Sequence, residues 1–276
     1  MKKLLTYTLI IFISFTGCKK EEKKPSTTSS SSSSSSGTGG SGGGTSSCND
    51  INFNTTTTYG TLTDIDGNTY KTIVIGSQEW MAENLRTSRY ANGDSIPNVT
   101  DNNEWTNLNT GAFCWNNNDS ATYECPYGKL YNWYAVVDTR NLCPTGWSVP
   151  HFYGDWIELT DHLGGFEVAG KMKEAGYDHW EMPNTDATNE SGFTGLPGGQ
   201  RYSSGAFVGG NDEGTWWSSQ DGGNLGADEA YDFGLLYNYG TIVGSNLNTP
   251  INIYFLLNFL KSEKQRGGFR VLRRVL

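Results

Sequence analysis

The sequence predicts an α+β domain in which short strands and long loops surround two helices. The 276 residues include 15 tyrosines, 12 phenylalanines and 9 tryptophans, which supply enough ring area to build a core. Only two stretches have apolar residues at helical spacing, whereas short strand-like runs bounded by Gly, Asn and Asp recur along the chain. A charged fraction of 18% and 35 glycines favour a loop-rich fold.

The amino terminus is typical of a lipoprotein signal. Lys2 and Lys3 precede an apolar stretch that ends near Thr16, and Gly17-Cys18 follow. A positive start and an apolar region of about 13 residues are typical of a secretory signal. Residues 15–18, Phe-Thr-Gly-Cys, resemble the bacterial lipobox, although Phe15 stands where leucine is usual. The resemblance implies that residues 1–17 are removed and that Cys18 carries lipid, such as palmitate. An ordinary secreted protein with a free Cys18 is the alternative.

Residues 18–48 are expected to form a linker between the lipid and the domain. A run of Lys and Glu at residues 19–24 is followed by a Ser- and Gly-rich stretch through Ser47. This composition is typical of flexible coil, with an extended limit of about 95 Å. Acidic residues soon after the lipidated cysteine resemble the surface-export signal of Bacteroidota lipoproteins, and a solvated charge run is the alternative. We therefore expect the protein on the cell surface, attached to the outer membrane by its lipid.

Residues 49–276 are expected to form one domain, because no second linker interrupts them. Strands are predicted at 61–65 and 70–75, joined by a hairpin turn at 66–68, Asp-Gly-Asn. The spacing of Asp64, Asp66 and Asn68 also occurs in calcium loops. However, Thr69 and Ile75 stand where an EF-hand loop needs glycine and glutamate, which favours the turn.

Helices are predicted at 152–163 and 167–175. In the first, Trp156, Leu159 and Leu163 fall at helical spacing, and Gly164 and Gly176 mark the two ends. Later strands are predicted at 215–219, 231–235 and 270–272.

Several motifs follow one another along the chain, at residues 66–70 (Asp-Gly-Asn-x-Tyr), 75–85 (Ile-Gly-x-Gln-x-Trp-Met-Ala-Glu-Asn-Leu), 127–136 (Tyr-Gly-Lys-Leu-Tyr-Asn-Trp-Tyr-Ala-Val), 142–150, 192–199, 216–219 and 269–271. In this order they resemble the Fibrobacter succinogenes major paralogous domain. The resemblance implies a domain of surface and secreted bacterial proteins without an assigned biochemical role. It also implies kinship with the formylglycine-generating enzyme family. The fold implied is C-type-lectin-like, a mixed or antiparallel sheet with two short helices and long loops.

Besides Cys18, the chain has four cysteines: Cys48, Cys114, Cys125 and Cys143. On the expected cell surface the environment is oxidising, so disulfides between them would persist. They allow three connectivities. Cys114 and Cys143 lie inside family-like segments, so the resemblance favours that pair. Cys48 then pairs with Cys125 or remains free.

Charge and cysteine placement argue against several functions. The part after Asn49 carries 14 basic and 27 acidic residues, which disfavours nucleic acid and an anionic membrane surface as partners. The related enzymes rely on cysteines near the carboxyl end, and no cysteine follows Cys143. A Cys143–His151 pair, a metal site on His151 and Asp155, and an acidic cluster with Glu158 and Asp161 are each too sparse to indicate catalysis. We therefore expect a protein that is not an enzyme, with no catalytic residues.

A binding module fits better, since sugar recognition uses aromatic faces together with amides and carboxylates. Trp115, Asn118 and Asp119 supply these groups and resemble the Trp-Asn-Asp motif of calcium-dependent lectins. The companion Glu-Pro-Asn triplet is interrupted at residues 181–184, Glu-Met-Pro-Asn. No cofactor is therefore expected, while calcium stays open and a metal site unknown.

Trp216 and Trp217 are a second candidate for ligand contact. In a strand their rings point to opposite faces, so one is expected to face the core and the other is a candidate ligand platform, with core packing of both as the alternative. The Gly-rich segment 209–214 before them is predicted to be a surface loop, where binding residues often lie. We expect a cell-surface binding or adhesion module for a glycan or a protein partner. The alternatives are a purely structural surface component and an unrecognised hydrolase.

Overall fold

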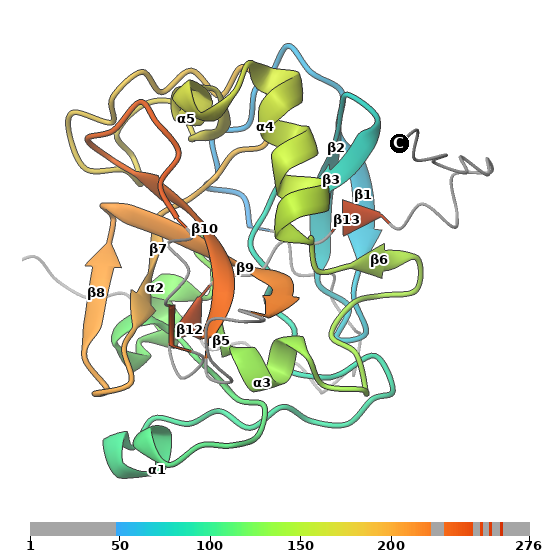
Figure 1. The fold of residues 1–276 in the computed structure, drawn as a ribbon, viewed down its shortest axis with the longest axis vertical. Helices are drawn as coiled ribbons and strands as arrows, with labels where there is room; N and C mark the ends of the chain where they lie inside the picture. Colours follow the sequence, from blue (N-terminus) through green and yellow to red (C-terminus); the bar gives the residue numbers. More distant parts are fainter. Residues whose placement is uncertain (1–47, 222–228, 245–248, 251–253, 256–259, 262–276) are drawn as a thin grey trace, which may run out of the picture. The chain divides into compact units, whose positions relative to one another are not determined.

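A computed structural model describes residues 48–221, 229–244, 249–250, 254–255 and 260–261 (Figure 1). The expected signal, Cys18, most of the linker and the strand at 270–272 lie outside these residues. The strands are β1 (Gly60–Thr63), β2 (Thr69–Ile75), β3 (Gln78–Met81), β4 (Phe113–Cys114), β5 (Leu130–Asn132), β6 (Trp147–Ser148), β7 (Gly198–Arg201), β8 (Phe207–Gly210), β9 (Glu213–Asp221), β10 (Glu229–Leu236), β11 (Thr249–Pro250), β12 (Tyr254–Phe255) and β13 (Leu260–Lys261). The helices are α1 (Asn102–Thr106), α2 (Ser120–Tyr123), α3 (Trp133–Val136), α4 (Ile157–Leu163) and α5 (Ala169–Met172), with short turns of other helix types at η1 (Asn116–Asn118), η2 (Phe152–Trp156) and η3 (Phe166–Val168).

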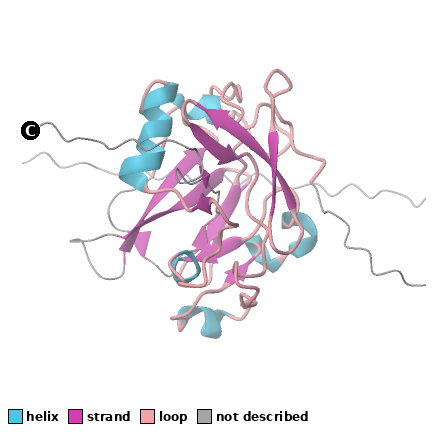
Figure 2. Ribbon diagram, turned by 90° about the vertical axis from the view of Figure 1, so that its right-hand side faces the viewer, coloured by secondary structure: helices cyan, strands magenta, loops and turns pink. Residues whose placement is uncertain are grey.

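Two sheets organise the described part of the chain. The first has the order β1-β2-β3-β13-β6, and its strand pairs are antiparallel. The second has the order β11-β10-β9-β7-β12-β5-β4, with β8 beside β7, and it is mixed because β7 and β9 run parallel. Short helices lie around the strands, and long loops connect them (Figure 2). The predicted α+β class with short strands and long loops is confirmed.

The predicted hairpin is present between β1 and β2, which pair Leu62 with Tyr70. Gly67 adopts a φ of 85° at the turn, a conformation that glycine enters without strain. One carboxylate oxygen of Asp64 accepts from the backbone N–H groups of Asp66 and Asn68, both at 2.9 Å, and the other accepts from the Tyr70 hydroxyl at 2.6 Å. The Asp64 carboxylate is thus engaged within the hairpin, which explains why this spacing forms a turn.

The first predicted helix is present, and the second is shorter than expected. Residues 152–163 form η2 and α4, and the helix ends at Gly164 with a φ of 117°. Residues 167–175 are helical only as far as Met172, because Lys173 turns to extended backbone and bridges to Gly195. The Gly195 N–H donates to the Met172 carbonyl at 2.8 Å, so pairing with a distant loop ends the helix. None of the helices in the described part is both long and apolar enough to cross a bilayer.

Aromatic side chains form a large part of the core. Trp156 stacks on Phe233 with ring centres 4.1 Å apart and 8° between the planes, and Trp80 lies 4.7 Å from Trp156. Trp216 joins this cluster through Phe193, at 5.9 Å. Fully burying a large apolar side chain contributes about 1.5–3 kcal/mol, so the unusual aromatic content is explained by the core.

The disulfide joins Cys48 to Cys125, one of the two possibilities left open for Cys48. Cys114 and Cys143 are free and buried, so the preferred Cys114–Cys143 pair is wrong. Cys114 packs in the cluster of Trp80 and Trp156, whereas Cys143 packs in a separate apolar cluster. Burial raises the pKa of the Cys114 thiol to about 12 and that of the Cys143 thiol further still, which keeps both thiols protonated and unreactive.

Candidate ligand-binding site

The segment from Trp115 to Asp119 is engaged in holding the fold. The half-buried Trp115 indole donates to Glu124, and the Asn118 amide donates to the Thr100 carbonyl at 3.3 Å. Asp119 caps α2 by accepting from the Thr122 N–H at 3.2 Å, and hydrogen bonds from Thr122 lower the pKa of Asp119. The structure thus keeps these three predicted residues in one segment, and each of them makes a side-chain hydrogen bond to the protein, while the buried Asn118 Oδ1 has no hydrogen-bond partner among the described residues.

Trp216 and Trp217 point to opposite faces of β9, as the strand pattern predicts, and both are fully buried. Trp217 packs against Trp133 at 5.4 Å, and its indole donates to the Tyr131 carbonyl at 2.9 Å. The alternative of core packing for both rings is therefore the one observed. Neither ring is open to a ligand.

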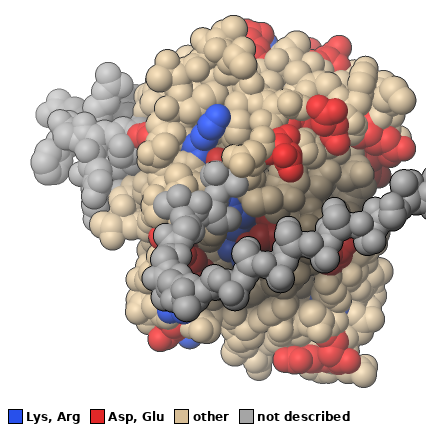
Figure 3. Space-filling model, turned by 180° about the vertical axis from the view of Figure 1, so that it is seen from behind, with Lys and Arg blue, Asp and Glu red and all other residues tan. Residues whose placement is uncertain are grey.

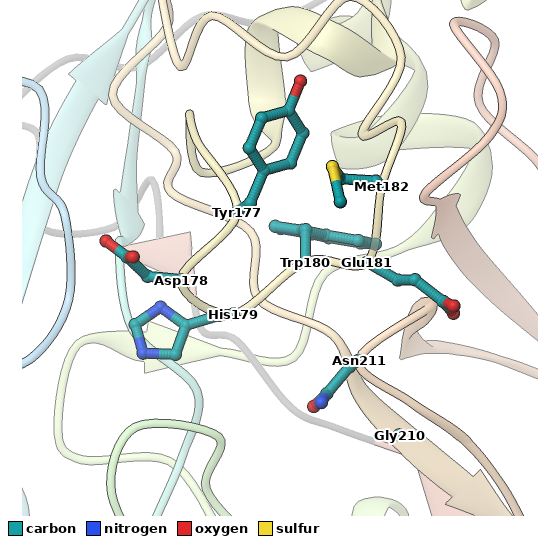
Figure 4. A pocket seen from close by; sticks show the side chains of 8 residues that line it. All are labelled: Tyr177, Asp178, His179, Trp180, Glu181, Met182, Gly210 and Asn211. Carbon is teal, nitrogen blue, oxygen red and sulfur yellow. The ribbon is translucent and has the colours of Figure 1, made fainter. Parts of the chain in front are cut away.

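A hollow of about 460 Å³ opens elsewhere on the described surface (Figure 4). One loop supplies most of its lining, and the end of β8 with the turn that follows it supplies the rest. The lining residues are Tyr177, Asp178, His179, Trp180, Glu181, Met182, Gly210 and Asn211.

Hydrogen bonds fix the loop that lines the hollow, both at its two ends and along its buried side. The Asn184 amide donates to the carbonyls of Glu174, at 3.0 Å, and Gly176, at 2.7 Å, which closes the base of the loop. The indole of the buried Trp180 donates to the Gly195 carbonyl at 2.9 Å. The Glu181 N–H donates to the Asn211 carbonyl at 2.8 Å, which joins the two segments that line the hollow.

Two large side chains give the hollow an exposed apolar wall. Tyr177 is 60% exposed and Met182 is 70% exposed, although both are bulky and largely apolar. In Figure 4 they stand on the same side of the Trp180 ring. An exposed aromatic face next to polar groups is typical of a ligand contact.

The polar groups of the hollow are partly engaged and partly free. Asp178 accepts from the Asn52 amide at 2.7 Å through one oxygen, and Asn211 accepts from the Tyr127 hydroxyl at 3.1 Å. The Glu181 carboxylate has no hydrogen-bond partner within the described part of the chain. Carboxylate oxygens and an amide are therefore available to a ligand.

His179 lies at the floor of the hollow and is only 9% exposed. Its Nδ1 lies 2.7 Å from the Glu174 carboxylate, which also accepts from the Asn52 N–H at 2.7 Å. Since a carboxylate accepts, Nδ1 carries a proton and donates it to Glu174. Nε2 has no partner among the residues that the structure describes.

A second hollow of about 380 Å³ lies beside β2. Its lining includes Ile73, Val74, Leu163 and His162 but no Tyr, Trp or Phe. Glu190, at its edge, lies 3.8 Å from the Lys171 ammonium. This hollow lacks the aromatic wall of the first.

The metal ligands that the sequence offered, His151 and Asp155, gain no further ligands within the described part of the chain. Among the described residues, no three His, Cys, Asp or Glu side chains gather closely enough to hold a metal ion. Asp155 accepts from the His151 N–H at 2.7 Å, so this carboxylate caps the helical turn η2.

The residues of the hollow were not predicted as a site. The sequence marked segments 181–184 and 209–214 separately, as an interrupted triplet and as a surface loop, and the structure brings them together. The predicted loop is shorter than expected, because residues 209–210 belong to β8 and residues 213–214 to β9, which leaves only 211–212 as a turn. Tyr177 and Asp178 carried a usable signal, because aromatic and acidic residues cluster directly after Gly176, the predicted end of the second helix.

Comparison with known proteins places the chain in a family without supplying a function. The model of the Fibrobacter succinogenes major domain matches residues 73–240, in agreement with the motifs in the sequence. No curated protein and no solved structure matches the chain.

Proposed function

The chain belongs to the Fibrobacter succinogenes major domain family, and on that premise we propose that this member is a carbohydrate-binding module. The observation that carries the proposal is the exposed wall of Tyr177 and Met182 beside unengaged polar groups in the hollow. A volume of about 460 Å³ lies within the range of about 300–1,000 Å³ that is usual for ligand sites.

The chemistry of the hollow matches a sugar ring. The face of Tyr177 can pack against the C–H surface of a pyranose, as aromatic side chains do with apolar surfaces. The Glu181 and Asp178 oxygens accept from hydroxyl groups, and the Asn211 amide donates because its oxygen already serves Tyr127. The loop is held by hydrogen bonds at its base, which lowers the ordering cost of binding.

Binding, not turnover, is the proposed activity. The lining includes no Ser, Thr or Cys nucleophile, and the buried thiols of Cys114 and Cys143 line neither hollow. A protein partner is the second candidate, favoured by the 70% exposure of Met182, since Met and aromatic residues are enriched at protein interfaces.

The finer fold and the location are part of the same proposal. A C-type-lectin-like arrangement is supported by the order of the family motifs and by a mixed sheet with long loops. Attachment to the outer membrane through a lipid on Cys18, with exposure on the cell surface, is supported by the sequence of residues 1–48.

A glycan array followed by titration calorimetry, both with the full chain, tests the proposal. We expect at least one oligosaccharide to bind, and Tyr177→Ala to weaken it about tenfold through loss of the stacking face. Tyr153→Ala is the matched control, because Tyr153 is 59% exposed at a different place and should leave affinity unchanged. Equal losses in both variants, or no glycan binding at all, would refute the site. Turnover of a bound polysaccharide would refute the non-catalytic proposal.

A further inference from the structure

We infer that the folded chain joins the side chains of Thr215 and Gln200 by an ester bond and releases ammonia. The bond links β9 to β7 within the second sheet. The inference goes beyond the proposed carbohydrate site and does not depend on it. It follows from the way in which two reactive side chains meet on one carboxylate.

The Glu213 carboxylate contacts both groups that the bond would join. One of its oxygens accepts from the Thr215 hydroxyl at 2.9 Å, and the other accepts from the Gln200 amide nitrogen at 3.0 Å. Thr215 and Gln200 are both buried, so water competes little for these contacts. A hydroxyl nucleophile and a leaving nitrogen are therefore held on the same proton-accepting group.

The strand register brings the two side chains within reach of each other. β7 and β9 run parallel and pair Gly199 with Gly214, so Gln200 and Thr215 each follow one residue after this pair. Paired strands lie about 4.8 Å apart. The bridge from Cβ of Thr215 through Oγ1, Cδ and Cγ to Cβ of Gln200 spans about 5 Å when extended. The length of the ester bridge therefore matches the spacing of the two strands.

The surroundings of Glu213 favour its action as a base. On the face drawn in Figure 3, acidic side chains gather at the surface, where water solvates them. Glu213 is half-buried instead. This burial raises the pKa of the Glu213 carboxyl above its ordinary value, and the nearby Asp212 and Asp232 add to the effect. A higher pKa makes the carboxylate a stronger base toward the Thr215 hydroxyl.

The reaction needs no external reactant. Glu213 accepts the hydroxyl proton while Thr215 Oγ1 attacks Cδ of Gln200, and the C–O bond forms. The C–N bond then breaks, and the same carboxyl group returns the proton to the departing nitrogen. One hydroxyl and one primary amide become one ester and one ammonia, without a change of oxidation state. The fold supplies the high effective concentration that two separate molecules lack.

Peptide mass spectrometry of the full chain, purified folded and then denatured and digested with trypsin, tests the inference. Trypsin cuts after Lys173, Arg201 and Lys261, so Gln200 and Thr215 fall in different peptides. We expect residues 174–201 and 202–261 to remain joined, in a species about 17 Da lighter than the two peptides together, because ammonia has been lost. Mild alkali should hydrolyse the ester, separate the peptides and leave the side chain of residue 200 as a carboxylic acid.

Two variants and one control assign the roles. Thr215→Val removes the nucleophile with little change of shape and should abolish the joined species. Glu213→Gln should slow its formation by about 100-fold or more, since general acid–base catalysis supplies rate factors of that size. Thr72→Val is the matched control, because the buried Thr72 hydroxyl also donates to a glutamate, Glu79, at 3.0 Å. The control should form the joined species as the wild type does.

The wild-type chain alone can decide against the inference. Two separate peptides of unchanged mass from the folded wild type would overturn it, whatever the variants do. A joined species that persists in Thr215→Val would also overturn it, since another linkage would then hold the peptides. Formation at the wild-type rate in Glu213→Gln would overturn it as well, because the contacts of this carboxylate are its basis. The fluorescence of the buried Trp216 and Trp217 shows whether each variant is folded.

Discussion

Replacing Cys48 and Cys125 together by serine should lower the free energy of unfolding by about 4.5 kcal/mol. The disulfide joins residues 77 positions apart. Loop closure over that length removes about 15 cal/mol/K of entropy from the unfolded chain, which gives about 4.5 kcal/mol at 25 °C. The free energy of unfolding of a domain is usually about 5–15 kcal/mol, so this single disulfide contributes a large share of the total stability.

Urea denaturation followed by tryptophan fluorescence is a direct assay, because Trp80, Trp156 and Trp216 are fully buried and report unfolding. Dithiothreitol should bring the wild-type chain down to the stability of the double variant and leave that variant unchanged.

Cys114→Ala with Cys143→Ala is the matched control, since it removes two cysteines but keeps the disulfide and should respond to the reductant as the wild type does. A difference below about 1 kcal/mol between the wild type and the Cys48 and Cys125 double variant, or no response of the wild type to reductant, would refute the loop-entropy reasoning.

Two further predictions concern charged side chains. Arg201→Lys should lower the free energy of unfolding by about 2–4 kcal/mol, because the buried guanidinium donates to three backbone carbonyls and to Asn102, and an ammonium cannot reach them all. Urea denaturation measures this loss, and an unchanged midpoint of the urea transition would contradict the prediction. The hydrogen bond from Arg140 lowers the pKa of Asp138 to about 2, so the folded state binds fewer protons than the unfolded state between about pH 2 and 4. This contribution is present above about pH 4 and is lost as the pH falls through about 2. Solvent screening keeps this contribution to stability small, because Arg140 is partly exposed. Asp138→Asn should flatten the acid limb of the stability profile, and the same limb in exposed Asp161→Asn should not change.

The elements predicted well are those whose causes are local. The hairpin depends on Gly67 and on an Asp64 carboxylate that bonds within four residues of itself, so the sequence contains the whole explanation. The opposite orientations of Trp216 and Trp217 follow from strand alternation. That both rings are covered depends on Phe193 and Trp133, which come from other parts of the chain.

The elements predicted poorly depend on contacts between distant segments. The second helix stops at Met172 because Gly195 pairs with the residues that follow it, and no local signal marks that stop. The candidate site depends on one backbone hydrogen bond between Glu181 and Asn211, thirty positions apart in sequence. The sequence shows how many aromatic and acidic residues there are, but it does not show which of them remain exposed to solvent in the folded chain.

The position of the disulfide has a mechanical consequence. A pull on the chain from its amino-terminal side enters the described fold at Cys48, and the covalent link passes the load to Cys125. After Cys48, Asn52 is attached to the fold, since it donates hydrogen bonds to the carboxylates of Glu174 and Asp178. A ligand held by Tyr177 would load the same loop from the opposite direction. Load between such a ligand and the amino-terminal side of the chain would therefore pass through this loop and its hydrogen bonds to Asn52.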